Sequence, residues 1–250
     1  SSRKLQPRTD TIRPSVVFLA GLFLTFLMVT AVICDAKEKH TATVIFLHGL
    51  GDSGHGWSEL VPQLQMPHVK FMFPNAPSMP VSLNMGMSMP AWFDLYSLDD
   101  ITREDIDGMQ NTRALVERLV QKEIDNGIPA SRIVIGGFSQ GGAIALFTGL
   151  STSQPLAGIL CLSGWLPGAL TQSVFPAAAT EEAKRIPLLM LHGERDQVVK
   201  LDWARNAFAF IQGVLHKVDS SQMKTYPHLE HSSSPAEIAD MRAWLKERLP

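Results

Sequence analysis

One serine in the sequence stands between two pairs of glycines and directly after an apolar run, in GGFSQGGA at Gly136–Ala143. The pattern G-x-S-x-G at the junction of a strand and a helix is typical of a nucleophile elbow, a sharp turn that projects the serine hydroxyl. Gly137 and Gly141 fit this interpretation because the turn presses backbone against backbone, where a Cβ atom would clash. A glycine-rich helix start is the alternative. Ser139 is therefore a candidate nucleophile that needs partners.

An acid and a histidine are the partners that such a serine requires, because the histidine takes its proton and the acid orients the histidine. After an elbow serine the chain order is Asp or Glu, then His. Asp196 follows the apolar run Ile186–Leu191, just past the end of a predicted strand, where ligand-facing residues gather. Glu194 is the rival in the same loop, whereas Asp202 and Asp219 resemble solvated carboxylates. A short turn that directs Asp196 back toward the serine favours it.

Four histidines follow the serine in the chain: His192, His216, His228 and His231. The first directly follows a core strand and is expected to be structural, and the second lies in a polar stretch. His228 and His231 share the loop before the last helix, whose start is marked by a capping box with proline at Ser234–Glu237. Spacing favours His231 as the base and leaves His228 as the alternative.

Backbone amides are the expected donors to the oxyanion that forms when a serine attacks an acyl carbon. One donor is the N–H of Gln140, which follows the nucleophile, and the other belongs to the loop after an early strand. That loop is glycine-rich, at His48–Gly56, and Leu50 is the candidate donor. A phosphate-binding loop is the alternative, but neither of the two common glycine frames for phosphate can be read there.

Apolar runs alternate with amphipathic segments along the chain, which predicts a mostly parallel sheet with helices on both faces. This is the alternation of a single α/β-hydrolase domain, expected over residues 41–250. A capping-like signal at Thr102–Asp105 precedes one of the helices. Strands are predicted at Thr43–Leu47, Val69–Phe73, Arg132–Ile135, Ala157–Leu162, Ile186–Leu191 and Gln222–Tyr226, and helices after the elbow and at Arg103–Asn126, Leu201–Val214 and Pro235–Leu249.

Composition excludes several classes of function. The 250 residues carry a net charge of -2 and no run of lysine or arginine, so no nucleic-acid partner is expected. The two cysteines indicate no disulfide framework, and Cys161 lies in an apolar run as a buried thiol. No cysteine and histidine spacing fits a zinc site, and we expect no metal and no cofactor.

The N-terminal region, residues 1–40, contains a continuous apolar stretch at Val16–Cys34 preceded by four basic residues. It is long enough to span a bilayer as a helix. Three interpretations are open: a membrane anchor, a signal peptide cleaved near Cys34-Asp35-Ala36, or a wrongly assigned gene start. An anchor or a signal would direct the following domain to the secretory pathway.

Seven short motifs, in order and over residues 41–250, resemble the acyl-protein thioesterases of the lysophospholipase/carboxylesterase branch of the α/β-hydrolases. The resemblance implies cleavage of palmitoyl thioesters from protein cysteines, with lysophospholipids or small esters as alternative substrates. The motifs are LHGLGDSGHGW (Leu47–Trp57), PNAP (Pro74–Pro77), MPAWFD (Met89–Asp94), NGIP (Asn126–Pro129), GGFSQGGA, SGWLP (Ser163–Pro167) and His231-Ser-Ser.

The resemblance also bears on the site and on the location of the protein. The catalytic histidine of the family directly precedes Ser-Ser, which selects His231, and the resemblance supports Asp196 and the amides of Leu50 and Gln140. It implies a cytoplasmic enzyme and a weak homodimer, with Val16–Cys34 outside the resemblance as a route to membrane association. Many relatives have a proline shortly after the acid, and this chain has none there.

A long acyl chain needs an apolar groove beside the serine, and methionine suits one because it adapts its shape. A methionine-rich stretch, SMPVSLNMGMSMPAW, ends at Trp92 and is too broken by proline and glycine for regular structure. Packing into the core is the alternative for this stretch, and for Trp92 above all. The candidate substrate-binding residues are Leu83, Met85, Met87, Trp92, Trp165 and Leu166.

Two functions of other classes are weighed against a hydrolase. A lipid-binding pseudoenzyme would keep the pocket without turnover, but such a protein has no reason to retain Ser139, Asp196 and His231 together. A membrane-anchored scaffold rests on Val16–Cys34 alone, and replacing the serine would leave its role intact.

Overall fold

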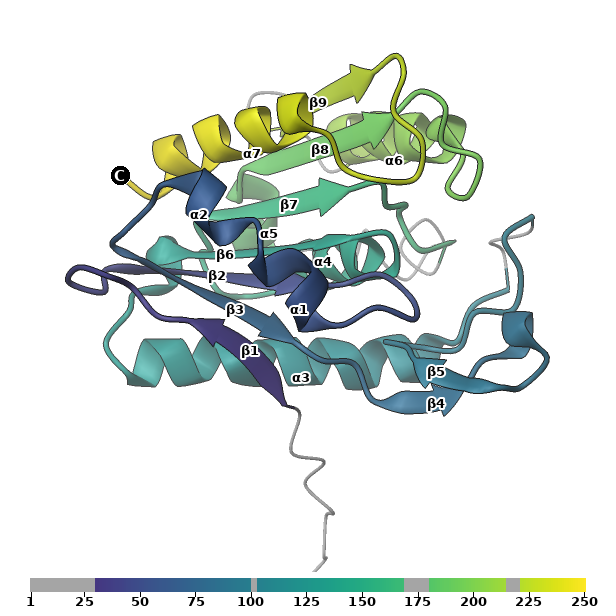
Figure 1. Ribbon diagram of the computed structural model, residues 1–250, viewed down its shortest axis with the longest axis horizontal. Helices are drawn as coiled ribbons and strands as arrows, with labels where there is room; N and C mark the ends of the chain where they lie inside the picture. Colours follow the sequence, from purple (N-terminus) through teal and green to yellow (C-terminus); the bar gives the residue numbers. More distant parts are fainter. Residues whose placement is uncertain (1–29, 100–102, 169–179, 215–220) are drawn as a thin grey trace, which may run out of the picture.

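The computed structural model describes residues 30–99, 103–168, 180–214 and 221–250. The strands of its main sheet are β1 (Ala31–Cys34), β2 (Ala42–Leu47), β3 (Val69–Pro74), β6 (Ile133–Phe138), β7 (Gly158–Leu162), β8 (Leu188–Gly193) and β9 (Ser221–Tyr226). They lie in the order β1-β3-β2-β6-β7-β8-β9 (Figure 1). β1 is antiparallel to β3, and the other neighbours are parallel. The carboxyl ends of the parallel strands therefore meet at one edge.

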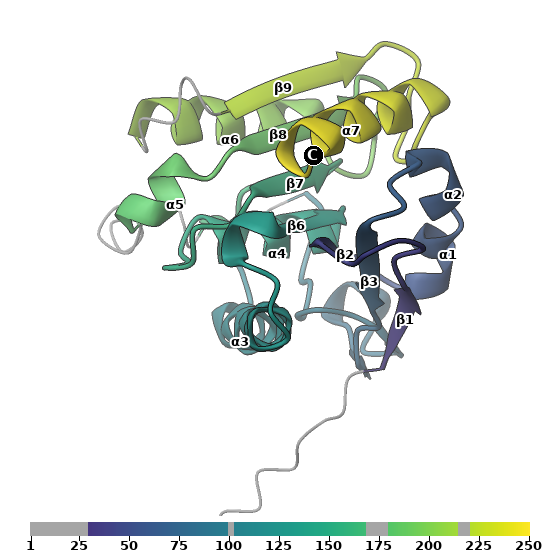
Figure 2. The same ribbon diagram turned by 90° about the vertical axis from the view of Figure 1, so that its left-hand side faces the viewer.

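Helices cover both faces of this sheet (Figure 2). One face packs against α3 (Ile106–Asp125), α4 (Gln140–Gly149) and α6 (Leu201–Val214), and the other against α1 (Gly54–Ser58), α2 (Val61–Leu64) and α7 (Pro235–Arg248). Both faces of β2 are buried: Ile45 packs into the first layer, and Phe46 into the second. Strands apolar on both faces are typical of parallel sheets, and the predicted mostly parallel sheet with helices on both faces is confirmed.

The shorter elements lie in the connections. A helix of one turn or more, α5 (Glu181–Arg185), precedes β8, and single 3₁₀ turns lie at η1 (Ser82–Asn84) and η2 (Ala130–Arg132). β4 (Ser78–Pro80) and β5 (Ser88–Pro90) pair antiparallel as a separate hairpin. This hairpin carries most of the methionine-rich stretch.

The two long outer helices begin at side-chain caps. The serine half of the expected capping box of α7 is present, because the Ser234 hydroxyl accepts a hydrogen bond from the Glu237 N–H at 3.2 Å and Pro235 follows it. The Glu237 carboxylate has no hydrogen-bond partner among the described residues. The cap of α3 is Asp105, whose carboxylate accepts from the Gly108 N–H at 3.0 Å. Thr102, the expected first residue of that cap, lies outside the described residues. Asp105 is therefore itself the N-cap of α3, and the helix starts three residues later than expected.

The sheet begins earlier in the chain than the expected boundary at Thr41. Ala31–Cys34 forms β1, paired with β3 from Ala31 opposite Pro74 to Cys34 opposite Phe71. The end of the apolar stretch is therefore part of the folded domain, and residues 16–29 of that stretch lie outside the described residues. None of the described helices is both long and apolar enough to cross a membrane.

A buried carboxylate ties α3 to the sheet. Glu123 is fully buried and accepts hydrogen bonds from the Lys70 ammonium at 2.6 Å and the Thr43 hydroxyl at 2.7 Å. Because a buried charge is costly without partners, these two contacts offset much of the cost of burying the carboxylate, and His40 Nε2 also lies 3.7 Å from it.

Candidate active site

Ser139 lies at the turn between β6 and α4, with φ 54° and ψ −120°. This left-handed φ is unfavourable for a residue with a side chain, and strain of this kind gathers at functional sites. A Cβ atom on Gly137 would lie 2.3 Å from the Gly141 carbonyl carbon, and one on Gly141 would lie 2.2 Å from the Leu47 oxygen. The two glycines therefore let the turn close against β2. The strand, turn and helix expected of an elbow are all present.

The loop before α7 brings His231 between the serine and Asp196. Its Nε2 atom lies 2.9 Å from the Ser139 hydroxyl, and its Nδ1 atom lies 2.7 Å from Asp196 Oδ2. An ionised carboxylate only accepts hydrogen bonds, so Nδ1 carries the proton and Nε2 accepts from the serine. Phe138 packs against the imidazole, with ring centroids 4.7 Å apart. The three residues form one hydrogen-bonded chain in the geometry that deprotonates a serine.

Asp196 is held as a carboxylate by the loop after β8. Burial by itself would raise its pKa, but the hydrogen bond and charge of His231 outweigh burial, together with the N–H groups of Val199 and Val198. The pKa of Asp196 is therefore lowered. The two amides bind Oδ1 at 2.8 and 2.9 Å, which leaves Oδ2 for the histidine.

The rejected alternatives for acid and base lie elsewhere. Glu194 is exposed and accepts a hydrogen bond from the Thr225 hydroxyl at 2.6 Å, and His228 is exposed. His192 is buried and donates from Nε2 to the Val199 carbonyl at 2.8 Å, and burial lowers its pKa. A neutral His192 thus supports the loop of Asp196, which is the structural role that its sequence position suggests.

The glycine-rich loop after β2 brings Leu50 to the same cavity as Ser139 and Gln140. The side chain of His48 holds this loop in place through two hydrogen bonds. Its Nε2 atom accepts from the Ala76 N–H at 3.0 Å, so the proton sits on Nδ1, which donates to the Gly49 carbonyl at 2.7 Å. Burial lowers the pKa of His48 and keeps the ring neutral. The sequence analysis did not predict this role, and the signal that it offered was a histidine directly after the apolar run that ends at Leu47.

A cavity of 230 Å³ opens beside the serine. Of the six candidate substrate-binding residues, the structure brings Leu83 and Trp165 to it. Met85 and Met87 lie outside its wall and are 86% and 52% exposed. Trp92 and Leu166 do not line this cavity and are packed into the core, which is the alternative given above for Trp92. The lining consists of Gly49, Leu50, Asp52, Leu83, Leu95, Leu98, Phe138, Ser139, Gln140, Trp165, Val198 and His231.

Three aliphatic lining residues were not anticipated: Leu95, Leu98 and Val198. They lie in loops outside any periodic segment, so the sequence carries no signal for the direction of their side chains. Among the described residues, no group of three histidine, cysteine, aspartate or glutamate side chains is placed to hold a metal ion.

The parallel sheet, the elbow and the hydrogen-bonded serine, histidine and aspartate define a serine hydrolase of the α/β-hydrolase class. The sequence profile of the phospholipase/carboxylesterase family matches residues 28–249, and the chain belongs to this family. That match includes β1, in agreement with the early start of the sheet.

Curated relatives cover almost the whole chain. The chain is 44% identical over 228 residues to acyl-protein thioesterase 1 of Cryptococcus neoformans var. neoformans serotype D, which covers 85% of this chain and 94% of the relative. It is 41% identical over 233 residues to acyl-protein thioesterase 1 of Gibberella zeae, covering 89% of this chain and 97% of the relative.

Solved structures show the same arrangement. Acyl-protein thioesterase 2 of Zea mays superimposes with a TM-score of 0.78 at 32% identity, covering 89% of this chain and all (100%) of that one. SOBER1 of Arabidopsis thaliana superimposes with a TM-score of 0.77 at 32% identity, covering 84% and 100%.

Proposed function

We propose that the chain is an acyl-protein thioesterase, a serine hydrolase that cleaves palmitoyl and related S-acyl thioesters from protein cysteines. The hydrogen-bonded chain of Ser139, His231 and Asp196 beside an apolar cavity carries the proposal. The relatives named acyl-protein thioesterase support the substrate class, since they cover most of this chain at 41–44% identity.

Acylation is the first half of the proposed reaction. The Ser139 hydroxyl attacks the thioester carbonyl while His231 Nε2 takes its proton, and the carboxylate of Asp196 stabilises the imidazolium. The negative oxygen of the tetrahedral intermediate accepts hydrogen bonds from the backbone N–H groups of Leu50 and Gln140. Collapse breaks the carbon–sulfur bond, and the imidazolium returns its proton to the departing cysteine sulfur.

Deacylation repeats these steps with water. His231 takes a proton from a water molecule as that water attacks the acyl-serine. The negative oxygen of the second tetrahedral intermediate again accepts hydrogen bonds from the N–H groups of Leu50 and Gln140. Breaking the ester bond frees the fatty acid and returns the proton to Ser139. The acyl chain occupies the cavity wall of Leu83 and Trp165 during both halves, so water is displaced from that side.

Lipid esters are the second candidate substrate class, because the family profile that matches the chain is that of phospholipases and carboxylesterases. The same three residues cleave an oxygen ester by the same steps. A lysophospholipid or a small carboxylic ester would then place its acyl chain against Leu83 and Trp165.

Side-by-side kinetics on the full chain test the proposal. A palmitoyl-cysteine peptide and lysophosphatidylcholine are each offered to the wild-type protein and to Ser139→Ala. We expect a higher kcat/KM for the thioester, and for both activities to fall by a factor of about 10⁴ or more in the variant. Preference for the lysophospholipid would support the second candidate, and turnover that survives Ser139→Ala would refute the proposed nucleophile.

Location and assembly follow the family resemblance. We propose a cytoplasmic enzyme that meets acylated proteins there, and a weak homodimer. A cut after Cys34 would remove β1 from the edge of the sheet, which argues against processing at that site. Fractionation of cells that express the tagged full chain tests the first proposal, and recovery in the lumen of the secretory pathway would overturn it. Sedimentation equilibrium tests the second, and a monomer at every concentration would exclude the dimer.

A further inference from the structure

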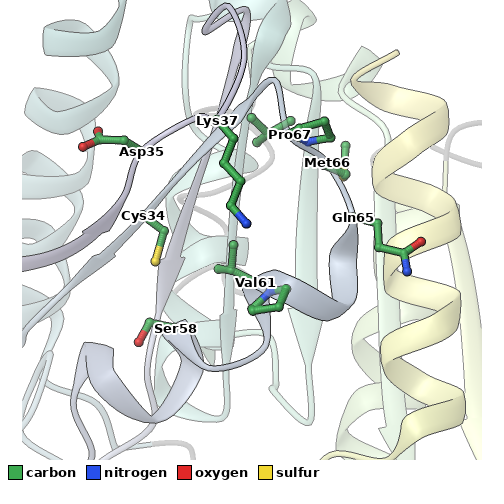
Figure 3. A pocket seen from close by; sticks show the side chains of 10 residues that line it. Cys34, Asp35, Lys37, Ser58, Val61, Gln65, Met66 and Pro67 are labelled. Atoms are coloured by element: carbon green, nitrogen blue, oxygen red, sulfur yellow. The ribbon is translucent and has the colours of Figure 1, made fainter.

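A second cavity lies between α2 and the edge of the sheet formed by β1 and β3 (Figure 3). None of its lining residues belongs to the active-site cavity. Val69 of the cavity pairs with Ala42 at the start of β2, and the start of β2 lies beside the start of β6. The six residues of β6 therefore separate the cavity from Ser139 along the strand direction. At 3.3 Å per residue that is a separation of about 20 Å along the strands. The cavity is therefore separate from the active site and lies at the opposite end of the parallel strands.

The wall of this cavity is apolar along most of its length. Met66 and Val69 are buried at its base, and Val61 and Pro62 of α2 form one side. Its volume of 370 Å³ is at the small end of the about 300–1,000 Å³ of ligand sites. A single alkyl chain of medium length fits such a space. The ten lining residues are Cys34, Asp35, Lys37, Ser58, Val61, Pro62, Gln65, Met66, Pro67 and Val69.

One cation faces this apolar wall. Lys37 is fixed at its backbone, where its N–H donates to the Pro67 carbonyl at 2.7 Å, and its side chain extends across the cavity toward Val61 (Figure 3). Asp35 is the one acidic residue of the lining, and its carboxylate points away from the other labelled side chains. No ion pair joins Lys37 to any other residue that the structure describes.

We propose that this cavity is a binding site for a medium-chain aliphatic carboxylate, with the alkyl chain against Val61 and Met66 and the carboxylate on the Lys37 ammonium. The charge and the apolar wall complement the two halves of such a ligand, since an ammonium attracts a carboxylate while the wall removes the chain from water. Lys37 is exposed, so a neutral alkyl chain would gain no attraction from the ammonium, and an alkyl cation would be repelled. The site does not depend on the reaction proposed for Ser139.

The thiol of Cys34 in this cavity can be used to measure ligand binding there. Cys34 ends β1 with its sulfur turned into the cavity, and it is partly exposed (Figure 3). Cys161, the other of the two cysteines in the chain, is fully buried, and burial raises its pKa to about 12. A thiol reagent therefore modifies Cys34 while the fold is intact, and modification of Cys161 signals unfolding.

The experiment measures alkylation of Cys34 by N-ethylmaleimide in the full-length protein, with decanoate below its micelle-forming concentration. For each protein, the alkylation rate without decanoate is divided by the rate with decanoate, so any effect of a substitution on the intrinsic reactivity of the thiol cancels. We expect decanoate at ten times its Kd to slow Cys34 about tenfold by mass action, with Cys161 unmodified. Decan-1-ol and decylammonium are expected to protect less at equal concentration.

Three variants separate the proposal from general adsorption. Lys37→Gln is expected to raise the Kd of decanoate about fivefold and to leave that of decan-1-ol unchanged. Lys39→Gln is the matched control, because Lys39 is exposed two residues away and outside the lining, and it should bind as the wild type does. Val61→Trp fills the cavity and should abolish protection. Equal protection by all three alkyl compounds, unchanged decanoate binding in Lys37→Gln, or no protection of the wild type would each overturn the site.

Discussion

The side chain of Gln140 binds the backbone of Trp92, 48 residues earlier in the chain. Its Oε1 atom accepts from the Trp92 N–H at 2.9 Å, and its Nε2 atom donates to the Phe93 carbonyl at 2.8 Å. The indole N–H of Trp92 in turn donates to the carbonyl of His48 at 2.8 Å. Gln140, Trp92 and His48 are buried, so one amide side chain connects the elbow helix to the loop that carries Leu50. The two proposed oxyanion donors are thus positioned by the same network.

Gln140→Ala is expected to weaken both the fold and the reaction. The change leaves two buried backbone groups unpaired, and each costs about 1–3 kcal/mol. We expect the free energy of unfolding to fall by roughly 2–6 kcal/mol and kcat to fall about tenfold as the loop relaxes. Urea denaturation and thioester kinetics measure these effects. Gln121→Ala, which removes an exposed bond to Asp125, is the control, and equally mild effects of both changes would contradict the network.

Asp196→Asn is expected to lower kcat by a factor of about 10⁴ with little change in KM. An amide offers an N–H to Nδ1 and favours the wrong tautomer of His231. Glu194→Gln in the same loop should change kcat less than about twofold, because Glu194 contacts Thr225 and not the histidine. A large loss in Glu194→Gln with activity retained in Asp196→Asn would reverse the assignment of the acid.

The same carboxylate links folding to pH. The folded pKa of Asp196 is lowered below its usual 3.8, so the ionised group stabilises the fold above that pH, and this contribution is lost as pH falls through the folded pKa. The difference in unfolding free energy between wild type and Asp196→Asn should therefore shrink below about pH 4. Urea titrations at pH 6 and pH 3 measure it, and a constant difference would show that the carboxylate contributes no pH-dependent stability.

The fold and the hydrogen-bonded residues were accessible from the sequence because each rests on a local rule. A serine between glycines after an apolar run, an acid just past a strand and a histidine before a capped helix each mark a strand end, and parallel strand ends meet at one edge. Ser139, Asp196 and His231 accordingly meet in the structure. Their catalytic roles stay predictions until the variants are measured.

The direction of side chains in loops could not be predicted from the sequence. Trp92 and Leu83 belong to the same apolar region, yet one packs into the core and the other lines the cavity, because long-range contacts with Gln140 and His48 decide the path of the chain. β1 was missed for a different reason. A four-residue strand at the end of a longer apolar run has no period of its own, so only its pairing with β3 reveals it.

Glu237→Gln is expected to stabilise the protein at neutral and basic pH. Burial raises the pKa of Glu237 to about 8, and the nearby charge of Asp196 adds to the shift. Between its usual 4.5 and about 8 the folded state holds a proton that the unfolded state releases, so stability falls by roughly 1.4 kcal/mol per pH unit. The glutamine variant lacks this slope. Urea titrations at pH 5 and 8 measure it, with exposed Glu59→Gln as the control, and parallel slopes in all three proteins would contradict the prediction.

Lys70→Met is expected to lower the free energy of unfolding by about 3–5 kcal/mol, because it removes the ammonium that pairs with the buried Glu123 carboxylate at 2.6 Å. The double variant Lys70→Met, Glu123→Leu should recover most of that loss, since no buried charge is left. Lys184→Ala removes a surface partner of Glu181 and should cost less than about 1 kcal/mol. Thermal and urea denaturation give all three values. A double variant no more stable than Lys70→Met would show that the loss arises from packing and not from the unpaired charge.

Leu83→Ser is expected to discriminate between acyl chains. Leu83 is 38% exposed and lines the cavity beside Ser139, so we expect a long acyl chain to bury it and a short one not to reach it. Losing that apolar contact costs about 1–2 kcal/mol, so kcat/KM for a palmitoyl thioester should fall roughly fivefold to thirtyfold, with little change for an acetyl thioester. Ile106→Ser on α3 is the control, because Ile106 is similarly exposed at 40% and outside the cavity. Equal losses for both acyl lengths would mean that Leu83 supports the fold of the site and does not contact the chain.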